Sequence, residues 1–199
     1  MSLAHLAAAG CLAAVLSACG IGQPIPQAAT YVVEPPPAAS VAAERRAETL
    51  RMGNVRVAPA FASEELVYRM DEVRFTPDFY NRFIAEPGPL LGGRMAEWLD
   101  RAGPFRSVAQ PGSAMPAQFV LEATVTELYG DFRPGRAPAA VVGVQFTLVD
   151  VSGITPKVVL ERSIERRIPL TQASADALVR GYGLALGEIL SELAAQIAH

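Results

Sequence analysis

The amino-acid sequence predicts an α+β fold, in which two amphipathic helices pack on one face of an antiparallel or mixed β-sheet. Several segments alternate apolar and polar residues, which is the period of a half-buried strand. Two further segments repeat apolar residues every three or four positions, which is typical of a helix that buries one side. The segments follow one another as strands, helix, strands and helix, and this order indicates an α+β domain.

Short strands are predicted in the N-terminal half of the chain. Residues 31–33 (Tyr-Val-Val) predict a strand that ends before the prolines at 35–37, because proline fits neither a helix interior nor a central strand. The pattern is strand-like again between residues 49 and 74. Residues 66–75 predict a β-hairpin whose turn is formed by residues 70–72 (Met-Asp-Glu).

Two helices are predicted from their apolar stripes. The first begins at residues 87–89 (Pro-Gly-Pro) and ends at Gly103, and its stripe consists of Leu91, Met95, Trp98 and Leu99. The second lies at the C-terminus, where Ser174 is the expected N-cap. Its buried stripe consists of Leu178, Tyr182, Leu186, Ile189, Leu193 and Ile197.

Three long strands are predicted between the helices, at residues 119–125, 142–148 and 158–164. Residues 130–138 are rich in Arg, Pro and Gly, and we expect them to form a long hairpin loop or a mobile tip. Arg162 interrupts the apolar face of the third strand. Either a β-bulge or an exposed end of the sheet would explain this arginine.

The N-terminal segment has the features of an export signal. Its apolar run at residues 6–15 is too short to span a bilayer as a stable helix. Four residues close the run in the order of a bacterial lipobox, which they resemble: Leu16, Ser17, Ala18 and Cys19. The segment contains no Lys or Arg, so an ordinary secretory signal or a short membrane anchor that contains a cysteine is the alternative.

The lipobox implies a division of the chain into three parts. We expect residues 1–18 to be a signal peptide and residues 19–30 to comprise the lipidated Cys19 and a tether. Residues 31–199 would then form the domain. Two prolines stiffen the tether, which at about 3.3 Å per extended residue reaches roughly 36 Å. The domain therefore stays close to the membrane that holds the lipid.

Composition excludes several classes of function. The formal net charge is −3, so there is no basic footprint for nucleic acid. The two histidines are His5, in the signal, and His199, the last residue. Without an interior histidine, Ser-His and Cys-His nucleophile pairs and His-rich zinc sites are excluded, and we expect no metal or cofactor. An enzyme that uses only carboxylates, such as a glycan hydrolase, would need two of them about 5–10 Å apart in a cleft. Glu86 and Glu122 are the acids to check.

Two groups of residues are candidates for partner contacts. Phe79, Tyr80 and Phe83 form an aromatic cluster that belongs either to the core or to a surface that binds a partner or lipid. Arg162 and Arg166 lie in a strand rich in charge, which is typical of a salt-bridged sheet edge. The alternative is an electrostatic contact with a partner or with lipid headgroups.

Glycines at positions 181, 183 and 187 superficially resemble a dinucleotide-binding loop. Such a loop lies between a strand and the start of a helix. Here the glycines fall inside a periodic helix, and we therefore predict close helix packing or a local kink.

Several segments together resemble a known family. They are the strand at 31–33, the Leu-Val-Tyr-Arg run at 66–69, the aromatic segment that ends in Ala-Glu-Pro at 85–87, residues 105–108, residues 121–132 and the final helix. In order and spacing, from Tyr31 to about Ile197, they resemble the ABC-type transport auxiliary lipoproteins, the group that includes PqiC (YmbA).

The resemblance implies a role without chemistry of its own. Such lipoproteins accompany an inner-membrane ATPase and permease and a periplasmic MCE-domain protein in moving lipids or hydrophobic compounds across the envelope. This chain would dock the periplasmic component at the outer membrane, and Gly20 after the acylated cysteine is compatible with that placement. A homo-oligomer is compatible with the sequence if a sheet edge pairs with a neighbour. The alternative is a structural lipoprotein of another outer-membrane biogenesis assembly.

Overall fold

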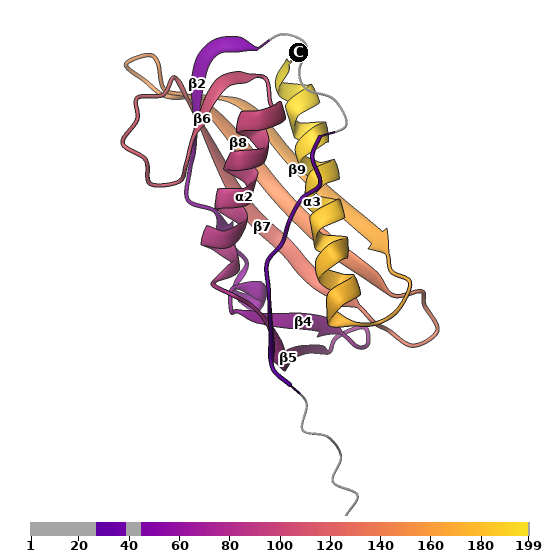
Figure 1. Cartoon of the computed structure of the whole chain (residues 1–199). Coiled ribbons are helices and arrows are strands. Elements are labelled where there is room, and N and C mark those ends of the chain that lie inside the picture. The colour runs from indigo at the N-terminus through magenta and orange to yellow at the C-terminus, as the bar shows by residue number, and fades with distance from the viewer. Residues whose placement is uncertain (1–26, 39–44, 199) are drawn as a thin grey trace, which may run out of the picture.

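The structure of the protein is a computed structural model that describes residues 27–38 and 45–198. In these residues a nine-stranded mixed sheet carries two helices on one face, α2 (Pro87–Ala102) and α3 (Ala175–Ala198) (Figure 1). The predicted α+β architecture is therefore confirmed. Neither helix is long and apolar enough to cross a membrane, nor is any other helix in the described part of the chain.

The three predicted long strands form an antiparallel meander. They are β7 (Phe119–Asp131), β8 (Ala139–Asp150) and β9 (Lys157–Pro169), each longer than the sequence indicates. The loop expected at 130–138 is correspondingly shorter, because β7 continues through Asp131 and β8 begins at Ala139.

β9 is an edge strand that pairs only with β8 among the described strands. Its ladder shifts register opposite Leu148 and Val149, whereas Arg162 lies in regular register opposite Phe146 and is exposed. Of the two explanations for Arg162, the exposed sheet position is therefore correct, and the bulge lies further toward the start of β9.

The second edge of β7 is covered by three short strands placed end to end. β2 (Arg46–Met52), β3 (Arg56–Val57) and β4 (Glu65–Arg69) each run parallel to it. A 3₁₀ turn at Pro59–Phe61 separates β3 from β4. β6 (Phe105–Ala109) pairs with the outer edge of β2. β6 was not predicted as a strand from the sequence.

The predicted hairpin is confirmed with a wider turn. β4 pairs antiparallel with β5 (Phe75–Phe83), and the N–H of Met70 donates a hydrogen bond to the carbonyl oxygen of Arg74 across the turn. β1 (Ala29–Tyr31) then pairs parallel with the end of β5. The strand expected at residues 31–33 therefore begins and ends two residues earlier, and the fully buried Val33 lies beyond it.

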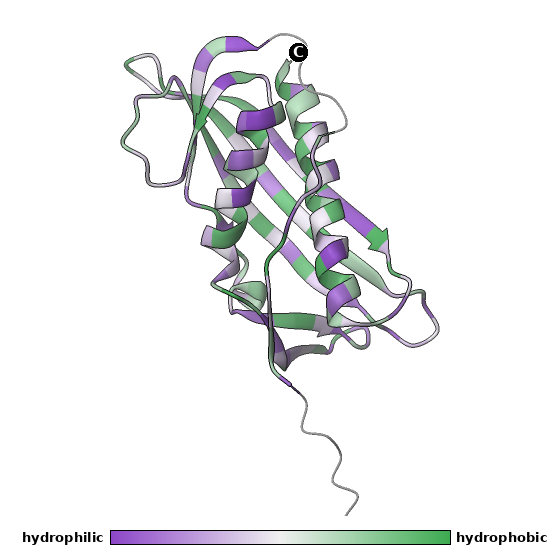
Figure 2. Ribbon diagram, viewed as in Figure 1, coloured by the Kyte–Doolittle hydropathy of each residue, from purple (hydrophilic) through white to green (hydrophobic). Residues whose placement is uncertain are grey.

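The core lies between the sheet and the two helices. In Figure 2 the strands behind the helices alternate between hydrophobic and hydrophilic residues, as one covered face requires. On the covered face of β8, alternate residues are buried: Ala140, Val142, Val144, Phe146 and Leu148. The predicted stripes of both helices are buried, that of α3 against β8 and β9 and that of α2 mainly against β6 and β2.

Candidate functional site

Residues 27–38 form an N-terminal strap that crosses the helical face of the domain. After β1, the strap runs between α2 and α3 (Figure 1). The indole Nε1 of Trp98 donates a hydrogen bond of 2.9 Å to the carbonyl oxygen of Pro36, and Arg94 forms an ion pair of 2.7 Å with Glu34. Val33 is fully buried. The strap is thus part of the folded domain. The predicted lipidation site, Cys19, lies outside the described residues.

Two of the α3 glycines make room for this strap. A Cβ atom at Gly183 would lie 2.3 Å from the carbonyl oxygen of Glu34, and one at Gly187 would lie 2.9 Å from Cδ of Pro36. Gly181 faces the sheet, where a Cβ atom would meet that of Ala140 at 2.6 Å. The prediction of close packing is confirmed. Part of that packing is against the strap, a contact that the local pattern of the helix does not reveal.

The aromatic cluster is divided by an irregularity in β5. Glu65 pairs with Arg82 and Leu66 pairs with Asp78, so residues 79–81 leave the β4–β5 ladder as a bulge. Phe79 is 79% exposed and Tyr80 is 45% exposed. The cluster is therefore divided between the two alternatives given by the sequence, with Phe79 and Tyr80 at the surface and Phe83 in the core.

Phe83 belongs to the core. It is 2% exposed, and its ring centroid lies 6.2 Å from that of Tyr182 on α3. It is therefore unavailable as a contact for a partner or lipid in this structure. Of the three aromatic residues, only Phe79 and Tyr80 stay candidates for such a contact.

Asp78 shapes the bulge that presents Phe79. Its Oδ1 accepts hydrogen bonds from the backbone N–H groups of Tyr80 (2.9 Å) and Asn81 (3.1 Å). Its Oδ2 accepts from the hydroxyl of Tyr68 and the side-chain amide of Asn81, both at 2.7 Å. Burial opposes ionisation of Asp78, but the hydrogen bonds from Asn81 and Tyr68 outweigh it and lower the pKa of the carboxyl.

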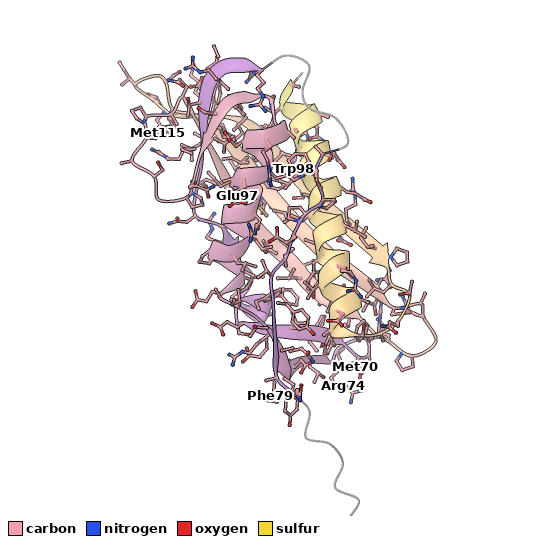
Figure 3. All side chains as sticks on the ribbon, in the orientation of Figure 1. Met70, Arg74, Phe79, Glu97, Trp98 and Met115 are labelled. Atoms are coloured by element: carbon pink, nitrogen blue, oxygen red, sulfur yellow. The ribbon has the colours of Figure 1, made fainter. Side chains whose placement is uncertain are left out.

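Four exposed apolar side chains lie along this end of the molecule, and we call them the β5 apolar edge: Val73, Phe79, Tyr80 and Ile84. The strap begins beside them. Ala29 is paired with Asn81, and the N–H of Ile84 donates to the carbonyl oxygen of Tyr31 at 3.0 Å. Figure 3 shows Phe79 projecting at the end where the described chain begins, with Met115 at the opposite end.

The arginines of β9 take part mainly in ion pairs within the domain. Arg166 lies on the helical face and pairs with Glu188 (3.2 Å) and Glu192 of α3. Arg162 is exposed and donates to the neighbouring carbonyl oxygen of Glu161 at 2.8 Å. The arrangement agrees with a salt-bridged sheet edge. Arg166 is tied to α3 by its ion pairs, whereas the contact of Arg162 is with the neighbouring residue of its own strand.

A buried ionic network joins the end of β7 to the β4–β5 turn. Asp131 is fully buried and pairs with Arg133 (2.7 Å) and Arg167 (2.6 Å). Arg133 also pairs with Glu72 of the turn at 2.7 Å. The hydrogen bonds from Arg133 lower the pKa of Asp131 far below its usual range, against the effect of burial, and Arg167 adds to them. Sequence reasoning missed this network because Glu72 and Arg167 are distant along the chain from Asp131 and Arg133.

The described residues contain no group of three or more His, Cys, Asp or Glu side chains that could hold a metal ion. Glu122 is exposed on the face of β7 away from the helices, where it pairs with Arg56 at 3.9 Å, and Glu86 is the N-cap residue of α2. The features that stand out are therefore surfaces and the strap.

Comparisons with known proteins agree with this architecture. The family model described as ABC-type transport auxiliary lipoprotein component matches residues 31–198. A crystal structure of a Xanthomonas campestris protein superposes with a TM-score of 0.74 at 16% identity, covering 85% of this chain and 95% of that one. The crystal structure of an uncharacterized protein superposes with a TM-score of 0.65 at 14% identity, covering 86% of this chain and 99% of that one. Among curated proteins, none matches the sequence. At these identities the structural likeness shows the fold.

Proposed function

This chain belongs to the family of ABC-type transport auxiliary lipoprotein components, and from that premise we propose that it is the lipid-anchored accessory subunit of an ABC/MCE-type system. In this role it holds the periplasmic MCE-domain protein at the outer membrane while lipids or hydrophobic compounds cross the envelope. The proposal gives the chain no catalytic step.

The observation that carries the proposal is the fastening of the strap to the domain. The anchor would be at Cys19, ten residues before Ala29, where the strap begins its pairing with β5. Burial of acyl chains stabilises membrane insertion by about 0.8 kcal/mol per methylene, so a multiply acylated cysteine is a lasting anchor. A domain fastened so close to its anchor has a high effective concentration for a partner at the same membrane.

The anchor is tested by substitution of Cys19. Cys19→Ala should abolish acylation, measured by mass spectrometry of the purified protein, and should release the protein to the soluble fraction. Cys11→Ala is the matched control, because Cys11 lies inside the apolar run and should act only as a small apolar residue. Acylation that persists in Cys19→Ala would refute the anchor.

The choice of membrane and partner needs two further measurements. Gly20→Asp should move the lipoprotein from the outer to the inner membrane fraction, whereas Gly20→Ser should leave it in place. Crosslinking in intact cells, pull-down and mass spectrometry should then recover an MCE-domain protein. Recovery of an outer-membrane β-barrel protein in its place would instead support a structural role in outer-membrane biogenesis.

A further inference from the structure

We propose that the β5 apolar edge contacts the lipid bilayer that holds the acyl chains of Cys19. This end of the domain then faces the membrane. The inference rests on the proposed anchor and adds an orientation to it. It concerns a surface formed by Val73, Phe79, Tyr80 and Ile84, all of which are at least 45% exposed.

The apolar residues on the surface are unevenly distributed. Of the ten exposed large hydrophobic residues in the described part of the chain, five lie within residues 73–84, and a smaller group of three lies around the β8–β9 turn: Ile154, Val158 and Val159. Single exposed apolar side chains are ordinary, whereas a group of them marks a surface that contacts another apolar phase or a partner. Phe75, the fifth, packs its ring on Tyr129 and Phe61 and is therefore explained by the fold.

The point at which the tether joins the domain favours this end. The ten residue steps from Cys19 to Ala29 span at most about 33–36 Å. Ala29 already lies at the β5 end, paired with Asn81. The opposite end, where Met115 is exposed, is about one α3 length away, and the 24 residues of this helix rise by about 36 Å. The tether would have to be fully extended to span that distance, whereas the β5 end lies directly where the tether joins the domain.

The bulge holds Phe79 in place before any contact is made. Asp78 accepts four hydrogen bonds within the bulge and from Tyr68, and Asn81 accepts one from the hydroxyl of Tyr31 on the strap. A side chain on such a braced turn loses little freedom on binding, which favours contact. The strap and the exposed aromatic residue are thus parts of one small framework.

The charges at this end favour insertion of aromatic side chains over attraction to anionic headgroups. Residues 63–84 contain five carboxylates and three arginines, and four of the carboxylates pair with nearby arginines. The segment therefore has no excess of positive charge. Tyrosine is enriched at membrane interfaces, where its ring is buried and its hydroxyl stays in water. Contact should therefore occur on zwitterionic lipid and be insensitive to salt.

The test places a fluorescent reporter at each end of the acylated protein. Phe79→Trp and Met115→Trp are matched variants at exposed positions, and the native Trp98 is buried and serves as a constant background. Acylation of Cys19 is first established by mass spectrometry, and the proteins are reconstituted into phosphatidylcholine vesicles with brominated acyl chains, which quench indole fluorescence on contact. We expect emission from Phe79→Trp to be quenched at least twofold more than that from Met115→Trp, in 0.1 M and in 0.5 M salt alike.

The outcomes separate the orientation from the anchor. Equal quenching of the two variants in acylated protein that floats with the vesicles would overturn the orientation, assign the apolar edge to a protein contact and leave the anchor intact. Purified protein without acyl groups would refute the proposed function and this inference with it. A further pair, Phe79→Ser and Met115→Ser, should differ in protection: only the first should increase protease access to residues near the strap on vesicles.

Discussion

Replacement of Gly183 by alanine is expected to lift the N-terminal strap out of its groove. The added Cβ atom would lie 2.3 Å from the carbonyl oxygen of Glu34 and 3.1 Å from its carbonyl carbon. Two backbone atoms cannot be rotated away as a side chain can, so either the strap or α3 must move. Since α3 is packed along β8 and β9, the strap is the segment that moves.

The magnitude follows from the contacts that hold the strap. Burial of Val33 stabilises by about 1.5–3 kcal/mol, and the hydrogen bond from Trp98 to Pro36 by about 0.5–1.5 kcal/mol. The ion pair of Arg94 with Glu34 is partly exposed and contributes only about 0–1 kcal/mol. Alanine in a helix interior offsets about 0.8–1 kcal/mol of this loss. We therefore expect Gly183→Ala to lower the free energy of unfolding by roughly 2–3 kcal/mol.

Trp98 is the single tryptophan of the chain and reports the strap directly. Urea unfolding followed by its emission should give a lower midpoint for Gly183→Ala, and acrylamide should quench the folded variant more strongly than the wild type. Gly93→Ala is the control, because a Cβ atom there would meet only Gln110 Oε1 at 3.9 Å. It should be as stable as the wild type or more so, by up to about 1 kcal/mol. The reasoning is refuted if the two variants are equally stable and Trp98 emission is unchanged.

Three further predictions concern the ionic groups. Asp131→Asn should lower the free energy of unfolding by roughly 2–3 kcal/mol at pH 7, because Arg133 and Arg167 lose their buried partner. The folded-state pKa of Asp131 is lowered, so the contribution of its carboxylate to stability is present above about pH 4 and is lost as the pH falls through the folded-state pKa. Urea midpoints measured between pH 7 and pH 2 should therefore fall less in the variant than in the wild type. Asp78→Ala should cost about 1–2 kcal/mol and speed hydrogen exchange of the amides at 80 and 81, whereas Asp78→Asn should keep part of the protection. Arg166→Ala should lower the free energy of unfolding, measured from the urea midpoint, by only about 0–1 kcal/mol, because its ion pairs with α3 are partly exposed and screened by solvent. A larger loss would contradict this explanation.

The parts of the fold that the sequence predicts are those with long regular periods. Both helices and the meander of β7, β8 and β9 carry enough alternation or helical repeat to be recognised locally. β2 and β6 are short and mix charged with apolar residues, so neither shows a clear period. The alignment of β2, β3 and β4 along one edge of β7 depends on distant pairing, which no local pattern encodes.

The aromatic segment shows why exposure could not be read from residue type. In a regular strand, Phe79 and Phe83 would lie on the same face, since they are four residues apart. The bulge at 79–81 breaks that alternation, and only Phe83 reaches the core. The local signal is Asp78, because an aspartate that accepts hydrogen bonds from N–H groups two and three residues later is a common turn-forming device.

The strap gives the glycines of α3 a role that connects the sequence to the proposed anchor. A helix with glycine at positions 183 and 187 is intrinsically less stable than one with alanine there. That cost is offset because the bare helix surface admits the backbone of residues 34–36, and the same segment continues back through β1 to the bulge that carries Phe79. A flexible linker would leave an anchored domain free to tumble. A strap seated on these glycines instead holds the start of the described chain beside the bulge, so that under the proposed anchor the end that carries Phe79 would face the membrane.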